Sequence, residues 1–181
     1  MRKTLIFIVI VSLLISIAYF GGTCVAQENE LGQSAYKRIP MEKSKIIIDD
    51  GDTVEYEGIT IRVLGLDTPE IKHPEHGFYR DQPFGRAATA LAKEYIINAK
   101  TVEYIPCKKD KYGRTLAHVL IDGVPLAVLM VRHGLAYETV SYYGDNGFPG
   151  YAREILEAAK HAPNPPFIAP HKWRKKNRDK K

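Results

Sequence analysis

Residues 48–74 read IDDGDTVEYEGITIRVLGLDTPEIKHP. The stretch predicts two strands, residues 53–56 and 59–66, joined into a hairpin by the turn Glu57-Gly58. Five acids lie close to a single arginine, Arg62: Asp49, Asp50, Asp52, Asp67 and Glu70. Neighbouring carboxylates repel unless they are protonated or bridged by a cation. The stretch therefore indicates a charged site as well as part of a fold.

The rest of the chain supplies further strands and three helices. Strand patterns cover residues 45–48, 101–105 and 115–121, and the turn KDKYGR separates the last two. Helical patterns cover residues 84–98, 126–133 and 151–161. Five short strands followed by packed helices predict an α+β domain, a small closed β-barrel with helices on its side.

The first 26 residues have the pattern of a signal peptide or of an N-terminal membrane anchor. Arg2 and Lys3 precede an uncharged run that is apolar over residues 5–20. Cleavage after Ala26 would fit a secretory leader, whereas residues 4–26 are also long enough to span a bilayer uncleaved. The basic start favours an exported body in either case. We therefore expect a secreted or extracytoplasmic protein, with membrane association through residues 4–26 as the alternative to cleavage.

The charge of the chain is unevenly distributed. The formal net charge is +5, but residues 27–170 carry 17 basic and 20 acidic residues, whereas residues 171–181 hold seven basic residues. This excludes a folded domain that binds nucleic acid through an overall positive charge. A nucleic acid would have to be bound through local positive charges, a metal ion or the basic tail. The tail is either a solvated end or a sequence-independent contact to phosphates, of nucleic acid or of anionic lipid.

The acids have two interpretations. Asp52 and Asp67, each at a strand end, could share a hard cation such as calcium, which takes oxygen ligands. Alternatively, Asp-Gly-Asp-Thr is an ordinary polar turn. Arg62 and Asp67 are five residues apart and should face opposite sides of one strand. Both reach one site only if the strand ends or bulges between them, and Gly65 is the expected place.

The arginines favour phosphate chemistry. Arg62 lies within an apolar strand, so its charge must be paired or functional. Arg114 closes the turn that begins at Asp110. The planar guanidinium can grip a phosphate with two hydrogen bonds. Glu70, three residues after Asp67, could then accept a proton from water as a general base.

Four motifs in order, IDDGDT, IRVLGLDTPE, DKYGR and VRHGLA, resemble the staphylococcal nuclease (thermonuclease) family over residues 45–160. The resemblance implies a five-stranded OB-fold β-barrel with three helices. It also implies a calcium-dependent phosphodiesterase that hydrolyses DNA and RNA and leaves 3′-phosphate ends.

The resemblance also implies roles for individual residues. Calcium would be bound by the carboxylates of Asp52 and Asp67 and the backbone carbonyl of Thr68. Glu70 would activate or orient the attacking water, and Arg62 and Arg114 would bind the scissile phosphate. Lys111 and Tyr112 would contact a neighbouring phosphate, and either Tyr142 or Tyr143 would contact the nucleotide.

These observations predict four segments and three competing functions. The segments are residues 1–26 as leader or anchor, 27–42 as a flexible lead, 43–161 as the nuclease-like domain, and 162–181 as a Pro-rich segment with a basic tail. An exported endonuclease, expected as a monomer acting on DNA and RNA, competes with an inactive OB-fold nucleic-acid-binding module and with a membrane-tethered assembly protein. A degenerate module would be free to lose its catalytic set, and all members of that set are present, which favours the enzyme.

Overall fold

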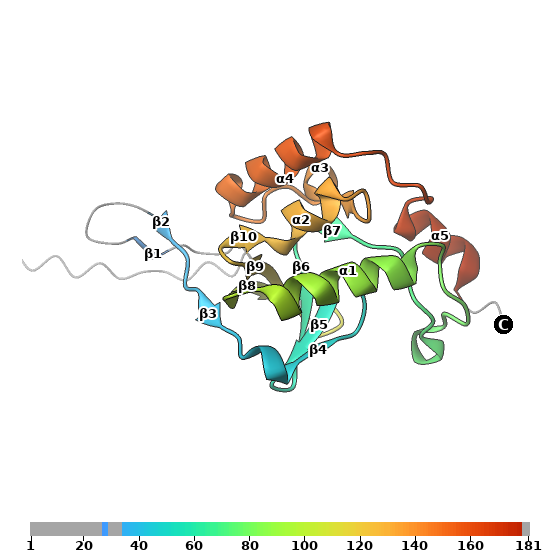
Figure 1. The fold of residues 1–181 in the computed structure, drawn as a ribbon, viewed down its shortest axis with the longest axis horizontal. Helices are drawn as coiled ribbons and strands as arrows, with labels where there is room; N and C mark the ends of the chain where they lie inside the picture. The colour runs from blue at the N-terminus through green and yellow to red at the C-terminus, as the bar shows by residue number, and fades with distance from the viewer. Residues whose placement is uncertain (1–26, 29–33, 179–181) are drawn as a thin grey trace, which may run out of the picture.

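The predicted hairpin lies in a curled main sheet, and the computed structural model describes residues 27–28 and 34–178 (Figure 1). The strands of the main sheet run in the spatial order β3-β8-β9-β6-β5-β4, and β10 pairs with β9. Their bounds are β3 (Ile39–Pro40), β4 (Ile46–Ile48), β5 (Thr53–Tyr56), β6 (Ile59–Val63), β8 (Val102–Lys109), β9 (Thr115–Ile121) and β10 (Val124–Pro125).

Two short ladders stand apart from the main sheet. They pair β1 (Gln27–Glu28) with β2 (Ser34–Ala35), and β7 (Leu66–Asp67) with β11 (Tyr137–Glu138). The second ladder matters for the site, because Tyr137 lies opposite Asp67.

The sheet confirms the predicted fold class. The five predicted strands correspond to β4, β5, β6, β8 and β9, and the pair β6–β9 is parallel while the other pairs of the main sheet are antiparallel. A register shift between Pro106 and Lys108 marks a bulge in β8, and bulges bend a strand and increase its twist. The sheet curls as a half-barrel with helices packed on it, which is an α+β arrangement consistent with the OB fold.

Five α-helices occur in the described residues. They are α1 (Gly85–Asn98), α2 (Leu126–Arg132), α3 (Val140–Tyr143), α4 (Pro149–His161) and α5 (Pro170–Asn177), with 3₁₀ turns η1 (Lys43–Lys45) and η2 (Pro74–His76). The three predicted helices are α1, α2 and α4. In Figure 1, α1 crosses the front of the sheet, α4 lies along the top, and α5 lies beside the start of α1.

The core lies between the curled sheet and these helices. Ile61 of β6, Leu126 of α2 and Ile155 of α4 are fully buried. Burial of an aliphatic side chain of this size stabilises the fold by about 1.5–3 kcal/mol. Five of the seven residues of α2 are buried, as expected of a helix that is apolar around most of its surface. This packing fixes the strands that carry the acids.

Part of the segment expected as a flexible lead, residues 27–42, packs onto the folded domain. Ile39 of β3 pairs with Tyr104 of β8, and Met41 is buried in the main core. The Tyr36 hydroxyl donates a hydrogen bond to the carbonyl of Gly147, at 2.7 Å. Because the lead is polar in sequence, its few apolar residues did not reveal this packing.

Residues 162–181, expected as a Pro-rich segment with a solvated basic tail, contain α5. Its Trp173 is only 6% exposed, and the ring centroid lies 5.8 Å from that of Phe78. In the segment that leads into α5, the carbonyl of Phe167 accepts a hydrogen bond from the hydroxyl of Tyr137, at 2.8 Å. An eight-residue helix is too short to be stable alone, so these tertiary contacts account for α5.

The predicted leader or anchor, residues 1–26, lies outside the described residues. Within the part of the chain that is described, none of the helices has the length and apolar character needed to span a membrane.

Candidate active site

A break in the second hairpin strand brings Arg62 and Asp67 together. β6 ends at Val63 and β7 begins at Leu66, with Gly65 between them at φ +88°. Arg62 Nη2 lies 2.8 Å from Asp67 Oδ1. This confirms the expectation that the strand must end near Gly65 for both side chains to reach one site, because alternation along an unbroken strand would separate them.

Asp52 is held by several donors. Its carboxylate forms an ion pair with Arg62 and accepts hydrogen bonds from the backbone N–H of Thr68, at 2.7 Å, and from the hydroxyl of Thr53, at 3.2 Å. The side chain is 1% exposed. A Cβ on Gly51 would lie only 2.8 Å from Thr68 Oγ1, so the absence of a side chain there lets the turn pack closely on Thr68.

The other two acids of the turn lie differently. Asp50 is buried and accepts a hydrogen bond from the N–H of Asp52, at 2.9 Å. Burial raises the pKa of Asp50, against the attraction of Arg62. The Asp49 carboxylate lies 3.4 Å from His73 Nε2. Asp50 thus belongs to the buried cluster, whereas Asp49 faces the following loop.

Glu70 is positioned through its backbone. Its N–H donates to Gln82 Oε1 at 3.3 Å, and its carbonyl accepts from the N–H of Gln82 at 2.8 Å. A Cβ on Gly85 would lie 2.2 Å from the carbonyl oxygen of Glu70, so α1 begins in direct contact with this residue. Gln82 is 1% exposed, and nothing in its sequence surroundings predicted this role.

Burial also sets the acidity of Glu70. The residue is 8% exposed, and desolvation raises the pKa of its carboxyl, although Arg174 favours the charged form. A carboxylate with a raised pKa is a stronger base than an ordinary glutamate. This is the property that general-base chemistry requires.

Arg174 of α5 enters the same cluster. Its Nη1 and Nη2 lie 3.0 Å from Oδ1 and Oδ2 of Asp67, and Nη1 also contacts Glu70 Oε1. Burial opposes the positive charge, but Asp67 and Glu70 outweigh it and raise the pKa of Arg174. No sequence pattern singled out this residue, since Arg174 stands among several basic residues of the tail.

Arg114 lies close to Arg62 along the sheet but has a different partner. It directly precedes β9, whose Leu116 is the register partner of Arg62 in the parallel pair with β6. Arg114 Nε and Nη2 each lie 2.9 Å from Asp110 Oδ2. Burial opposes ionisation of Asp110, but hydrogen bonds from Arg114 and the turn outweigh it and lower its pKa.

The predicted substrate-contacting residues lie at the surface. The Tyr112 ring is 66% exposed, with Lys111 Nζ 5.0 Å from its centroid. Tyr142 and Tyr143 are 83% and 69% exposed and lie edge to face on α3, which follows β11. Tyr137 of β11 pairs with Asp67 of β7. The two tyrosines follow Tyr137 by only a few residues, which places α3 next to the strand that carries Asp67. Both remain candidates for the nucleotide contact.

The oxygen atoms of this cluster suit a hard cation, but arginine side chains contact the same carboxylates. Among residues 27–28 and 34–178, no group of three His, Cys, Asp or Glu side chains is arranged to hold a metal ion. The oxygen donors of Asp52, Asp67 and Thr68 match calcium chemistry. The buried Thr68 Oγ1 has no hydrogen-bond partner in the described residues. An ion at this site would have to replace arginine contacts.

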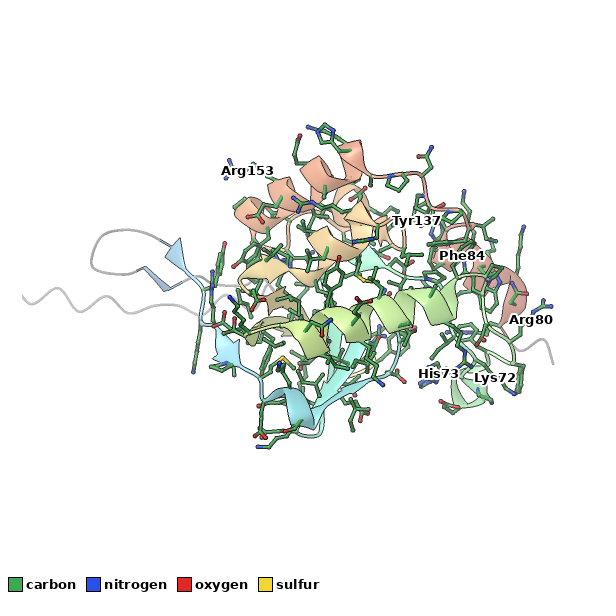
Figure 2. The ribbon with its side chains drawn as sticks, viewed as in Figure 1. Lys72, His73, Arg80, Phe84, Tyr137 and Arg153 are labelled. Atoms are coloured by element: carbon green, nitrogen blue, oxygen red, sulfur yellow. The ribbon has the colours of Figure 1, made fainter. Side chains whose placement is uncertain are left out.

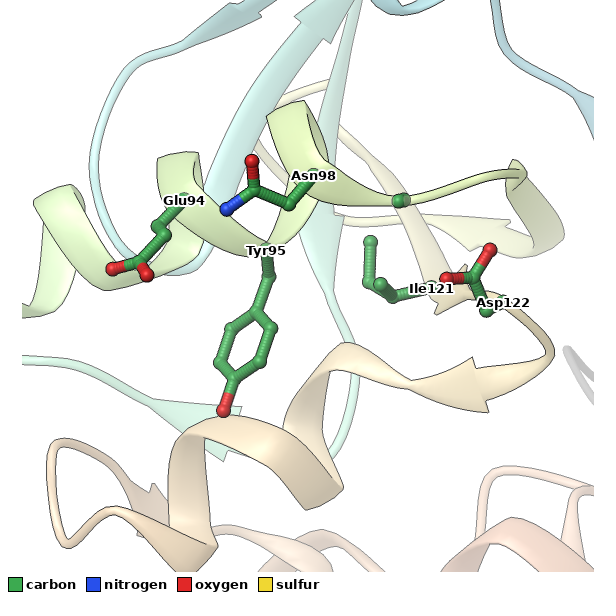
Figure 3. A pocket seen from close by; sticks show the side chains of 6 residues that line it. Glu94, Tyr95, Asn98, Ile121 and Asp122 are labelled. Carbon is green, nitrogen blue, oxygen red and sulfur yellow. The ribbon is translucent and has the colours of Figure 1, made fainter.

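A separate pocket lies at the C-terminal end of α1 and the turn between β9 and β10 (Figure 3). It is lined by Glu94, Tyr95, Asn98, Ala99, Ile121 and Asp122. None of the clustered acids lines it, so it is not part of the candidate active site.

The sequence matches known proteins over the segment that holds most residues of the candidate active site. The profile of staphylococcal nuclease homologues matches residues 60–164. The chain belongs to the staphylococcal nuclease family. The matched residues include Arg62, Asp67, Glu70 and Arg114, whereas Asp52 precedes them and α5 follows them.

Named relatives agree with this membership. A thermonuclease of Staphylococcus intermedius is 37% identical over 92 residues, covering 48% of this chain and 53% of the relative. A thermonuclease of Staphylococcus hyicus is 34% identical over 122 residues, covering 65% and 68%. Endonuclease YncB of Bacillus subtilis is 39% identical over 93 residues, covering 48% and 43%. The matches thus span about half to two thirds of these relatives.

Proposed function

We propose that this protein is an exported calcium-dependent endonuclease that hydrolyses phosphodiester bonds of DNA and RNA and leaves 3′-phosphate ends. The observation that carries the proposal is Arg62, held between Asp52 and Asp67 at the strand break, with the buried Glu70 joined to Asp67 through Arg174. Relatives named thermonuclease and endonuclease support the same activity.

Arg62 and Arg114 would bind the scissile phosphate. A guanidinium has five N–H donors, more than Arg62 uses in its contacts to Asp52 and Asp67. The ion pairs therefore fix the orientation of Arg62 while leaving it donors for phosphate oxygens. Arg114, braced by Asp110, would donate to the same group from the turn that precedes β9. Two positive charges would stabilise the charge that develops on the phosphoryl oxygens.

Glu70 would activate the water. In the hydrolytic step, a water oxygen attacks phosphorus, Glu70 takes the proton, and the bond from phosphorus to the 5′ oxygen breaks. The leaving oxygen acquires a proton from solvent, and the phosphate stays on the 3′ oxygen. Its raised pKa suits Glu70 to this transfer.

The remaining residues would bind the ion and the strand. Asp52, Asp67 and the carbonyl of Thr68 would hold calcium, which when bound supplies positive charge beside the phosphate. Lys111 would contact a neighbouring phosphate. Bases would stack on the exposed rings of Tyr112 and of Tyr142 or Tyr143, with little sequence preference.

Export rests on the N-terminal pattern of Arg2 and Lys3 followed by an apolar run. The enzyme would be released by cleavage after Ala26, or would stay anchored through residues 4–26 and act outside the membrane.

The test is cleavage of denatured DNA and of RNA by the full chain, with calcium and with a chelator. Loss of the base in Glu70→Gln should lower the rate by about 10²–10⁴-fold, and Arg62→Ala should lower it by about 10²–10³-fold. Glu154→Gln and Arg153→Ala are matched controls, because both residues are exposed on α4. Figure 2 shows Arg153 at the opposite end from Lys72, Arg80 and Phe84, which lie near α5.

Calcium-dependent cleavage that is lost in both site variants and kept in both controls would support the proposal. Retained binding of DNA without cleavage would instead make the protein an OB-fold binding module, and cleavage unaffected by Glu70→Gln would remove that residue from the mechanism.

A further inference from the structure

The guanidinium of Arg174 occupies the carboxylates that the proposed function assigns to calcium and to water. Both oxygens of Asp67 accept from Arg174 at 3.0 Å, while Arg62 also contacts Oδ1. Arg174 further contacts Glu70 Oε1. A carboxylate oxygen that already accepts from one or two N–H groups has to give up these bonds before it can coordinate an ion.

The contact is a specific one. A planar guanidinium matches a carboxylate in the two-bond arrangement that Arg174 forms with Asp67. The Arg174 side chain is 28% exposed and those of Asp67 and Glu70 are 9% and 11% exposed, so solvent screens these pairs less than it screens surface ion pairs. Asp67 and Glu70 would repel each other without a nearby cation, and Arg174 supplies the positive charge that offsets this repulsion.

A packed helix presents this arginine. Trp173, its neighbour in α5, is buried against Phe78. At the end of the helix, the Asn177 side chain accepts from Arg80 and donates to the carbonyl of Trp173. Just before the helix, the carbonyl of Ile168 accepts from Gln82 Nε2, at 2.7 Å. Contacts on both sides of Arg174 thus hold it at the acids.

We propose that Arg174, held by the docked helix α5, is an internal competitor for the divalent cation and keeps the nuclease in a resting form. This inference rests on the proposed function, because it assumes that Asp67 and Glu70 serve the ion and the water. Calcium and the guanidinium require the same oxygens, so only molecules with Arg174 displaced can bind the ion fully. The apparent calcium affinity is then reduced by the fraction of molecules in that displaced form.

The test is isothermal titration of CaCl₂ into the full chain in non-ionic detergent, without nucleic acid. Arg174→Gln removes the competing charge and should lower the calcium Kd at least about tenfold, or about 1.4 kcal/mol. Lys175→Gln removes the same charge from an exposed position of the same helix, and should change the Kd less than about threefold because solvent and salt screen it.

A third variant separates competition from simple removal of charge. Trp173→Ala keeps Arg174 and the net charge, but removes the buried ring that anchors α5 on Phe78. It should also lower the calcium Kd about tenfold, with circular dichroism confirming that the domain stays folded. Tightening in Arg174→Gln alone would reduce the effect to charge removal and overturn the proposal.

Two other outcomes are distinguishable. Equal calcium affinity in wild type and Arg174→Gln would overturn the internal competitor and leave the proposed function intact. Absence of calcium binding in every variant would overturn both the competitor and the calcium site.

Discussion

Gln82 offers a direct test of how Glu70 is positioned, through the substitution Gln82→Met. The side chain is 1% exposed. It accepts from the N–H of Glu70 at 3.3 Å and donates to the carbonyl of Ile168 at 2.7 Å. Methionine has a similar length and shape but can form neither bond. The substitution thus releases the backbone of Glu70 and the segment that leads into α5 at the same time.

The expected loss of stability is about 2 kcal/mol. An unpaired buried donor such as the N–H of Glu70 costs about 1–3 kcal/mol, and the lost bond to Ile168 contributes about 0.5–1.5 kcal/mol. Added apolar burial by methionine offsets about 1 kcal/mol of this total. For a chain of this size, about 2 kcal/mol corresponds to a fall in Tm of roughly 4–8 °C.

Urea unfolding followed by circular dichroism measures this loss. Lys93→Met introduces the same residue at an exposed position of α1, and should change the free energy of unfolding by less than about 0.5 kcal/mol. If Gln82→Met proved as stable as Lys93→Met, the two hydrogen bonds would not be stabilising, and the assignment of Gln82 as the support of Glu70 would be wrong.

Three further predictions concern the core, the strand break and the helix α5. His118 is buried, and burial lowers its pKa to about 4. An unfolded histidine titrates near 6.5, so the unfolded state takes up the proton first as the pH falls. The free energy of unfolding therefore decreases by up to about 3 kcal/mol between about pH 6.5 and about pH 4. His118→Phe should abolish this part of the pH dependence in urea unfolding. Gly65→Ala should destabilise by about 2–4 kcal/mol in thermal unfolding, because φ is +88° and the Cβ would lie 2.4 Å from Ile155 Cδ1. Calcium should shift the emission of Trp173, the single tryptophan of the sequence, to longer wavelength as α5 leaves Phe78.

Each of these predictions has a control and a result that would contradict it. A stability profile of His118→Phe parallel to that of wild type between pH 6.5 and 4 would show that His118 is not the responsible group. Gly123→Ala tests backbone strain alone, since Gly123 has φ +83° with nothing within 4 Å of a Cβ; equal losses at Gly65 and Gly123 would exclude crowding by Ile155. Trp173 emission that is unchanged at saturating calcium would mean that α5 stays docked when the ion binds.

Local pattern was sufficient to predict most of the fold. The strands β4, β5, β8 and β9 and the helices α1, α2 and α4 follow from apolar periodicity and turn residues, which depend on neighbours in sequence. The same holds for the break at Gly65, because side-chain alternation allows Arg62 and Asp67 to meet only if the strand ends between them.

Long-range packing explains what the sequence did not predict. Residues 39–41 join the sheet and the core only because β8 lies beside them. The helix α5 is too short and too polar for its pattern to be recognised, and Phe78, Arg80 and Gln82 stabilise its docking from about 90 residues away. Such contacts leave no periodic signal.

The sequence by itself determined the acids, the arginines and the order of the motifs, and with them the family and the type of chemistry that we propose. Only the tertiary structure decided which groups meet: Asp49 turns toward His73, Arg114 pairs with Asp110, and Arg174 reaches Asp67 and Glu70. The physical reason is that residue type fixes which charges and donors are available, whereas their partners depend on distances set by the packing of segments far apart in the chain.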